Sequence, residues 1–141
     1  MNPSHKRVAE EASRPITFRA AEELGALELA KLWADGTAWP LVDRTQYDEL
    51  SELAVMSALG KWLRRWQPIA IHGAMLAGAR PEAVAAALGN DLRVAFDRWH
   101  EWAVIQRDTI VGDKPGITAE EYDAVARRFA TVGIRPDKST P

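Results

Sequence analysis

The stretch that most constrains the fold runs from residue 81 to residue 107, PEAVAAALGNDLRVAFDRWHEWAVIQR, because two helical patterns meet in it at one glycine. Pro81 suits the first turn of a helix, where a backbone N–H has no intrahelical partner to lose. Gly89 tolerates the left-handed conformation in which many helices end. Asp91 has the side chain of a helix N-cap, and apolar residues at steps of three and four follow it. The stretch therefore predicts two helices joined by a tight turn.

The same spacing of apolar residues recurs on both sides of this helix pair. The sequence predicts further helices over residues 17–35, 45–66, 68–78 and 118–130. The second of these opens with a capping box, Thr45 to Asp48, and the last with another, Thr118 to Glu121. Residues 110–117 contain Gly-Asp and Pro-Gly pairs that mark chain reversals, so a loop is expected there. No run of strand-like alternation is present, and the expected fold class is all-α, a compact bundle of five or six helices.

Chain length sets the expected number of domains. At 141 residues the chain is long enough to bury one core and short for two ordinary domains with a linker. Residues 1–15 are polar and lack an apolar period, so we expect a disordered N-terminal arm. A single helical domain is expected over residues 16–131, with the helix pair at 81–107, followed by a flexible tail over residues 132–141.

The composition excludes several classes of protein. The absence of cysteine removes disulfide frameworks, thiol nucleophiles and cysteine-based zinc sites. No window reaches about eighteen uninterrupted apolar residues, and the N-terminal residues lack the apolar core of a signal peptide. We therefore expect a cytoplasmic protein with no membrane partner.

No group of residues has the spacing of a catalytic or metal site. His5, His72 and His100 lack the HExxH or His-carboxylate pattern of a metal site. The GDKPG segment lacks the spacing and the trailing Ser or Thr of a phosphate-binding loop. His72 lies in an apolar stretch, where a histidine is more often a hydrogen-bonded interior residue than a ligand. The sequence therefore predicts no enzyme, no cofactor and no metal.

Charge is distributed unevenly along the chain. Residues 8–59 contain four Lys and Arg against ten Asp and Glu, whereas residues 60–107 contain seven against four. The basic surplus therefore lies around the helix pair, which suits either a nucleic-acid surface or an ordinary solvated one. Trp62 and Trp66 lie four apart beside basic residues and have two interpretations, core packing or a platform on which bases stack.

Residues 81–102 resemble the helix-turn-helix of many bacterial regulators, recombinases and sigma factors. Val84 and Leu88 match the buried positions of its first helix. Ala85 matches the small residue where the two helices cross, and Gly89 matches the glycine of the turn. The resemblance covers about a sixth of the chain. It implies double-stranded DNA as the partner, with the second helix in the major groove.

The second helix departs from this family in its register. The family places a β-branched residue and then an apolar or Trp residue six and nine positions after the glycine, where this chain has Ala95 and Arg98. Phe96 and Trp99 have the same separation one position later. The turn is therefore expected to be one residue longer than the common form.

A helix over residues 92–107 has two contrasting faces. The face expected to be buried contains Leu92, Ala95, Phe96, Trp99, Trp102, Ala103 and Gln106. The opposite face contains Arg93, Val94, Asp97, Arg98, Glu101, Val104 and Ile105. Asp97 and Glu101 lie at the centre of this outward face, where their negative charge would repel phosphate.

Two functions are compatible with these patterns. The first is a small DNA-binding transcriptional regulator, for which a homodimer is the usual form. Its candidate base and phosphate contacts are Asn90, Arg93 and Arg98, with Arg80, Lys61, Arg64 and Arg65 as further phosphate contacts. The second is a protein-interaction module that binds a protein partner or a second copy. Its candidate residues are Val94, Asp97, Glu101, Val104 and Ile105, with the acidic N-terminal half as another surface.

Overall fold

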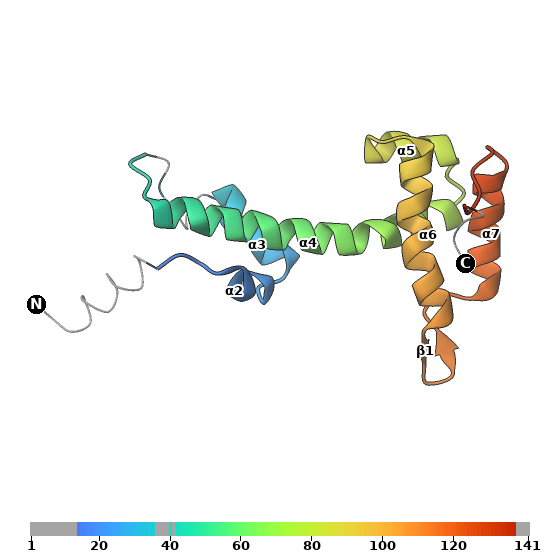
Figure 1. Ribbon diagram of the computed structural model, residues 1–141, viewed down its shortest axis with the longest axis horizontal. Helices are drawn as coiled ribbons and strands as arrows, with labels where there is room; N and C mark the ends of the chain where they lie inside the picture. The colour runs from blue at the N-terminus through green and yellow to red at the C-terminus, as the bar shows by residue number, and fades with distance from the viewer. Residues whose placement is uncertain (1–13, 36–39, 41, 138–141) are drawn as a thin grey trace, which may run out of the picture. The chain divides into compact units, whose positions relative to one another are not determined.

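The computed structural model describes residues 14–35, 40 and 42–137, and Figure 1 shows their helices and strands. The helices are α2 (Phe18–Glu22), α3 (Ala26–Asp35), α4 (Gln46–Leu76), α5 (Pro81–Leu88), α6 (Leu92–Asp108) and α7 (Ala119–Ala130). Two short strands, β1 (Ile110–Val111) and β2 (Lys114–Pro115), form an antiparallel hairpin. The predicted all-α class is confirmed. Residues 1–13 of the predicted arm and residues 138–141 of the predicted tail lie outside the described residues.

The chain divides into two compact units, Met1–Arg65 (unit 1) and Trp66–Pro141 (unit 2), and the boundary lies inside α4. The single domain predicted over residues 16–131 stays a prediction. α4 has 31 residues and is therefore about 46 Å long, which exceeds the diameter of one small domain. Its first part packs in the core of unit 1 and its last part in the core of unit 2. One helix thus supplies both cores.

Unit 1 has a small apolar core formed by α2, α3 and the first part of α4. Its buried apolar side chains are Ala21, Leu29, Val55 and Ala58. The prediction of one helix over residues 17–35 is wrong, because the chain is interrupted between α2 and α3. Gly25 adopts φ +77°, a left-handed conformation that a continuous helix does not contain.

α4 is continuous where the sequence predicted a break between residues 66 and 68. Proline removes a backbone donor and usually interrupts a helix, but Pro68 lies inside α4. The helix loses one hydrogen bond there, and the burial of Ile71 and Met75 in the following turns offsets that loss. At the start of α4 the predicted capping box is confirmed, since Thr45 N–H donates to Asp48 Oδ2 at 2.8 Å.

Unit 2 packs the end of α4 against α5, α6 and α7. Its buried side chains include Ile71, Met75, Val84, Ala85, Phe96, Trp99, Val125 and Phe129. Figure 1 shows α5 crossing one end of α6 at a steep angle and α7 running beside α6. The bounds of α5 and α6 agree with the predicted helix pair, and α7 agrees with the helix predicted from its capping box.

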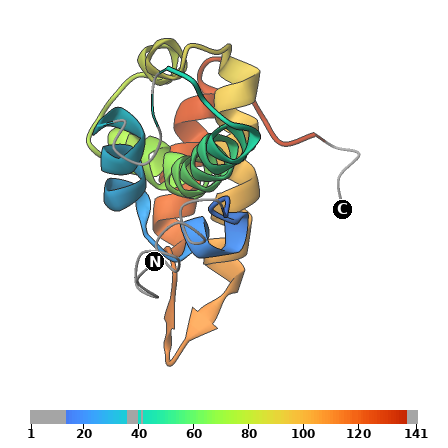
Figure 2. The same cartoon turned by 90° about the vertical axis from the view of Figure 1, so that its left-hand side faces the viewer.

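The segment between α6 and α7 forms a hairpin where the sequence predicted a loop. Ile110 pairs with Pro115, and Val111 pairs with Lys114. Gly112 has φ +68° at the turn, a conformation that glycine adopts without strain. Figure 2 shows the two strands extending away from the helices of unit 2.

Candidate functional site

The connection between α5 and α6 is a tight turn held by local hydrogen bonds. Gly89 has φ +69° and ψ +28°, and Asn90 N–H donates to Ala85 O at 3.1 Å. Asp91 caps α6 by accepting a hydrogen bond from Val94 N–H at 2.8 Å. These contacts supply the local geometry on which the helix-turn-helix resemblance depends, and the helix-turn-helix itself remains a prediction.

The face of α6 that packs in the core is the one expected from the sequence. Ala95, Phe96, Trp99 and Ala103 are buried, and Leu92, Trp102 and Gln106 are half-buried. On the outward face, Arg93, Asp97, Arg98, Glu101 and Ile105 are exposed, and Val94 and Val104 are half-buried. The rotation of α6 therefore leaves its charged face available to a partner.

Both candidate arginines of α6 already have partners within unit 2. Arg93 Nε lies 3.1 Å from Asp97 Oδ1, and its Nη1 donates to the backbone oxygen of Arg135 at 2.9 Å. Arg98 Nη1 donates to Gln67 Oε1 at 2.7 Å. The pair with Arg93 offsets the negative charge of Asp97, which the sequence alone had placed as a repulsive group.

The remaining DNA-binding candidates fall in both units. In unit 2, Asn90 Nδ2 donates to Leu88 O at 3.4 Å, and Arg80 Nε lies 3.7 Å from Glu82 Oε2. The other candidates, Lys61, Arg64 and Arg65, belong to unit 1. Lys61 pairs there with Glu22, and the Arg65 guanidinium lies 5.7 Å from the ring centroid of Trp62.

The division into units changes the interpretation of the charge pattern. Unit 2, residues 66–141, contains nine Lys and Arg against ten Asp and Glu, a net charge of -1. The basic surplus found over residues 60–107 depends on Lys61, Arg64 and Arg65, which belong to unit 1. A positive field around the helix pair of unit 2 is therefore not produced by that unit's own composition.

A groove of about 450 Å³ follows the outward face of α6 and is called the α6 groove below. Its lining residues are Arg93, Phe96, Asp97, His100, Glu101, Val104, Ile105, Pro136 and Asp137. Four of the five residues predicted for protein interaction line it, and the fifth, Val94, does not. The groove combines apolar side chains with three carboxylates and one arginine in its lining.

Sequence reasoning missed the part of the α6 groove that comes from the end of the chain. Pro136 and Asp137 line it, and the adjoining Arg135 accepts the hydrogen bond from Arg93. The acceptor is a backbone carbonyl, which every residue has. No pattern of side chains could therefore have predicted this contact.

A buried hydrogen-bond chain links α4, α6 and α7. Trp99 Nε1 donates to His72 Nδ1 at 3.0 Å, and His72 Nε2 lies 3.1 Å from Glu121 Oε2. Since Nδ1 accepts, a neutral imidazole with its proton on Nε2 satisfies both contacts. The hydrogen bond from His72 is the main cause that lowers the pKa of Glu121. His72 is only 6% exposed, and its interpretation as a hydrogen-bonded interior residue is confirmed.

His100 lines the α6 groove and makes a second polar contact. Its Nε2 atom lies 2.9 Å from Tyr122 Oη, and the Arg107 guanidinium lies 4.4 Å from the centroid of the Tyr122 ring. Burial, and then the positive charge of Arg107, lower the pKa of His100. The stability that this shift contributes is complete above the ordinary pKa of 6.5 and is lost as the pH falls through the lowered value.

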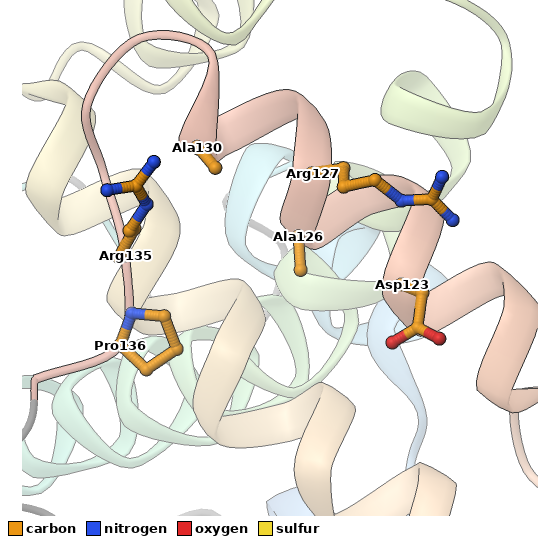
Figure 3. Close-up of a pocket in the computed structure, with 6 residues that line it drawn as sticks. All are labelled: Asp123, Ala126, Arg127, Ala130, Arg135 and Pro136. Carbon is orange, nitrogen blue, oxygen red and sulfur yellow. The ribbon is translucent and has the colours of Figure 1, made fainter.

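A second pocket of unit 2, about 290 Å³ in volume, lies between α7 and the segment that follows it (Figure 3). Its lining residues are Asp123, Ala126, Arg127, Ala130, Arg135 and Pro136. In Figure 3 the guanidinium groups of Arg127 and Arg135 extend away from each other. The pocket therefore does not direct its two cations at one ligand.

The part of the chain that the structure describes was searched for a metal site and for a membrane-spanning helix. Within it, no three His, Asp or Glu side chains lie close enough together to hold a metal ion. None of its helices combines the length and the apolar character needed to cross a bilayer.

Comparisons found no match to a protein-family model, to a curated protein or to a solved structure.

Proposed function

We propose that unit 2 binds double-stranded DNA, with α6 as the helix that enters the major groove. The observation that carries this proposal is the α5–α6 pair. Its turn has the left-handed Gly89, its second helix has the N-cap Asp91, and the small Ala85 is buried between the helices. The match of these residues to the helix-turn-helix pattern supports a DNA-reading role for the exposed start of α6.

The charges near the start of α6 support the same proposal. Arg98 is exposed, and among the described residues it donates one hydrogen bond, from Nη1 to Gln67, so its other N–H groups can reach a phosphate or a guanine edge. Arg80 and Asn90 are exposed at the two ends of α5, where helix-turn-helix proteins contact the phosphate backbone of DNA. Glu101 remains an exposed carboxylate on this face and weakens a phosphate contact next to it.

Fluorescence anisotropy with a mixed-sequence duplex tests the proposal. We expect Arg98→Glu to weaken binding about 10- to 100-fold, because it replaces a phosphate or base contact with a repulsive charge. Wild-type affinity should also fall steeply between about 50 and 200 mM salt. Arg127→Glu on α7 is the matched control, since it makes the same charge change at an exposed position on another helix. Equal weakening by the two variants, or affinity that does not depend on salt, would contradict DNA reading by α6.

A second candidate function is binding of a protein segment in the α6 groove. The specific observation is that Val104 and Ile105 line the groove together with three carboxylates, Asp97, Glu101 and Asp137, against one cation, Arg93. A binding surface for a peptide usually combines apolar contacts with charges opposite to those of the peptide. The groove therefore suits a segment that presents an apolar side chain between Lys or Arg residues.

The test of this second candidate uses labelled peptides of alternating Leu and Lys. We expect Ile105→Ser to weaken their binding about tenfold, because an apolar contact in the groove is lost. Ile110→Ser, an exposed isoleucine of the hairpin, is the matched control and should leave binding unchanged. A peptide of alternating Leu and Glu that binds equally well would show that the carboxylates of the groove do not select the partner.

A further inference from the structure

Unit 1 exposes an apolar stripe on α4 that its own core does not use. Leu53, Met56 and Leu63 are 60%, 47% and 54% exposed. With Gly60 they are separated by three, four and three positions, so all four lie on one side of the helix. The buried Val55 and Ala58 lie on the other side. This set of four residues is called the α4 stripe.

Gly60 is the unusual member of the α4 stripe. Glycine in the interior of a helix destabilises the helix relative to alanine. A Cβ atom at Gly60 would meet nothing within 4 Å, so packing within the described residues does not require glycine there. Unlike Gly73, Gly60 lies between large exposed apolar side chains, so it leaves a notch into which a side chain of another helix can fit.

We infer that the α4 stripe pairs with the same stripe of a second copy of this chain, with the two helices antiparallel. Spacing of three and four is the pattern that places side chains of one helix into the gaps of another. In an antiparallel pair centred on the stripe, Leu53 of each copy lies opposite Leu63 of the other. Met56 then lies opposite Gly60, so the long side chain fills the notch. The arrangement is closed by a two-fold axis, as in most homodimers.

Charge at the two ends of the stripe favours the second copy in this orientation. Glu49 is exposed one turn before the stripe, although it also pairs with Arg44 at 3.1 Å, and Arg64 is exposed at the other end. An antiparallel pair places the acidic end of one helix beside the basic end of the other, whereas a parallel pair places like charges together. Because the stripe is short, we expect a dissociation constant of about 1 to 100 µM.

Sedimentation equilibrium of the full chain over a concentration series tests the pairing. We expect the wild type to form dimers and Gly60→Leu to raise the dissociation constant at least about tenfold, because leucine fills the notch that Met56 occupies. The substitution improves helix propensity, so loss of folding does not explain loss of dimers, and circular dichroism checks this. Gly73→Leu is the matched control, because Gly73 also lies in α4 with open space around its Cβ position. A wild type that stays monomeric up to about 1 mM, or equal effects of the two variants, would overturn the inference.

Cysteine crosslinking tests the orientation, and the natural chain contains no cysteine that would interfere. We expect the double variant Leu53→Cys, Leu63→Cys to form disulfide-linked dimers on mild oxidation, since the two positions lie opposite each other in the antiparallel pair. The single variant Leu53→Cys should crosslink poorly. Faster crosslinking of the single variant would overturn the antiparallel arrangement, because it requires a parallel pair.

Discussion

Replacing Trp99 with alanine is expected to lower the free energy of unfolding by about 3 to 5 kcal/mol, a large part of the stability of a small domain. Trp99 is 0% exposed, and its ring centroid lies 5.4 Å from that of Tyr122 and 5.8 Å from that of Phe129. The substitution leaves a cavity among α6 and α7 and removes the hydrogen bond to His72. Urea unfolding followed by circular dichroism at equilibrium measures the loss.

Trp33→Ala is the control for this measurement. Trp33 is 48% exposed on α3, so the same change of side chain removes far less buried surface. We expect it to change stability by less than about 1 kcal/mol. Equal losses in the two variants would contradict the orientation of α6, which places Trp99 in the core and Arg98 beside it in solvent.

The helices of unit 2 could be predicted because their ends are set by nearby residues. Asp91 and Thr118 each accept a hydrogen bond from a backbone N–H three residues later, so the cap is encoded in four consecutive residues. Gly89 likewise ends α5 through its own conformation. The register of α6 then followed from its apolar spacing alone.

The predictions that failed involve glycine and proline, whose local preference is expressed at some positions and overridden at others. Gly25 interrupts the helix predicted over residues 17–35, whereas Gly60 and Gly73 are accommodated inside α4. Pro68 was expected to break α4, but side chains that follow it are buried in unit 2. A local sequence pattern does not record which of these residues has tertiary contacts to oppose its preference.

The sequence predicted which residues of α6 face outward, but not which residues from other segments lie beside them. The outward residues of α6 follow from periodicity, and they are the residues that the structure exposes. Arg93 and Arg98 have partners on Arg135 and Gln67, which are far away in sequence. The basic residues proposed to contact DNA lie close together in sequence, but the boundary inside α4 divides them between the two units. The tertiary contacts of the candidate site are therefore not contained in the sequence pattern.

His72→Leu is the second substitution with a large expected effect, a loss of about 1 to 3 kcal/mol in the free energy of unfolding. Leucine approximately fills the space but accepts no hydrogen bond, so the buried Nε1–H of Trp99 is left without a partner. In a double-mutant cycle, Trp99→Phe removes that donor. The loss in the free energy of unfolding of the double variant should then be smaller than the sum of the two single losses by about 0.5 to 3 kcal/mol.

The control for this cycle pairs His72→Leu with Trp62→Phe, an aromatic change in unit 1. Trp62 and His72 share no hydrogen bond, since the Trp62 indole donates to Glu22 O at 3.4 Å. Their effects should add within about 0.5 kcal/mol. Coupling as large as that between His72 and Trp99 would mean that the effect is not specific to the buried bond.

The pH dependence of the same variants tests the other end of the hydrogen-bond chain. The bond from His72 lowers the pKa of Glu121 below its ordinary value of 4.5, so its contribution to stability is present above that value and is lost as the pH falls through the lowered pKa. Without His72 this loss should be smaller. The stability difference between wild type and His72→Leu is therefore expected to shrink below about pH 4.5, while the effect of His100 is common to both proteins. A difference that stays constant from neutral pH to pH 3 would show that the carboxylate of Glu121 does not depend on His72.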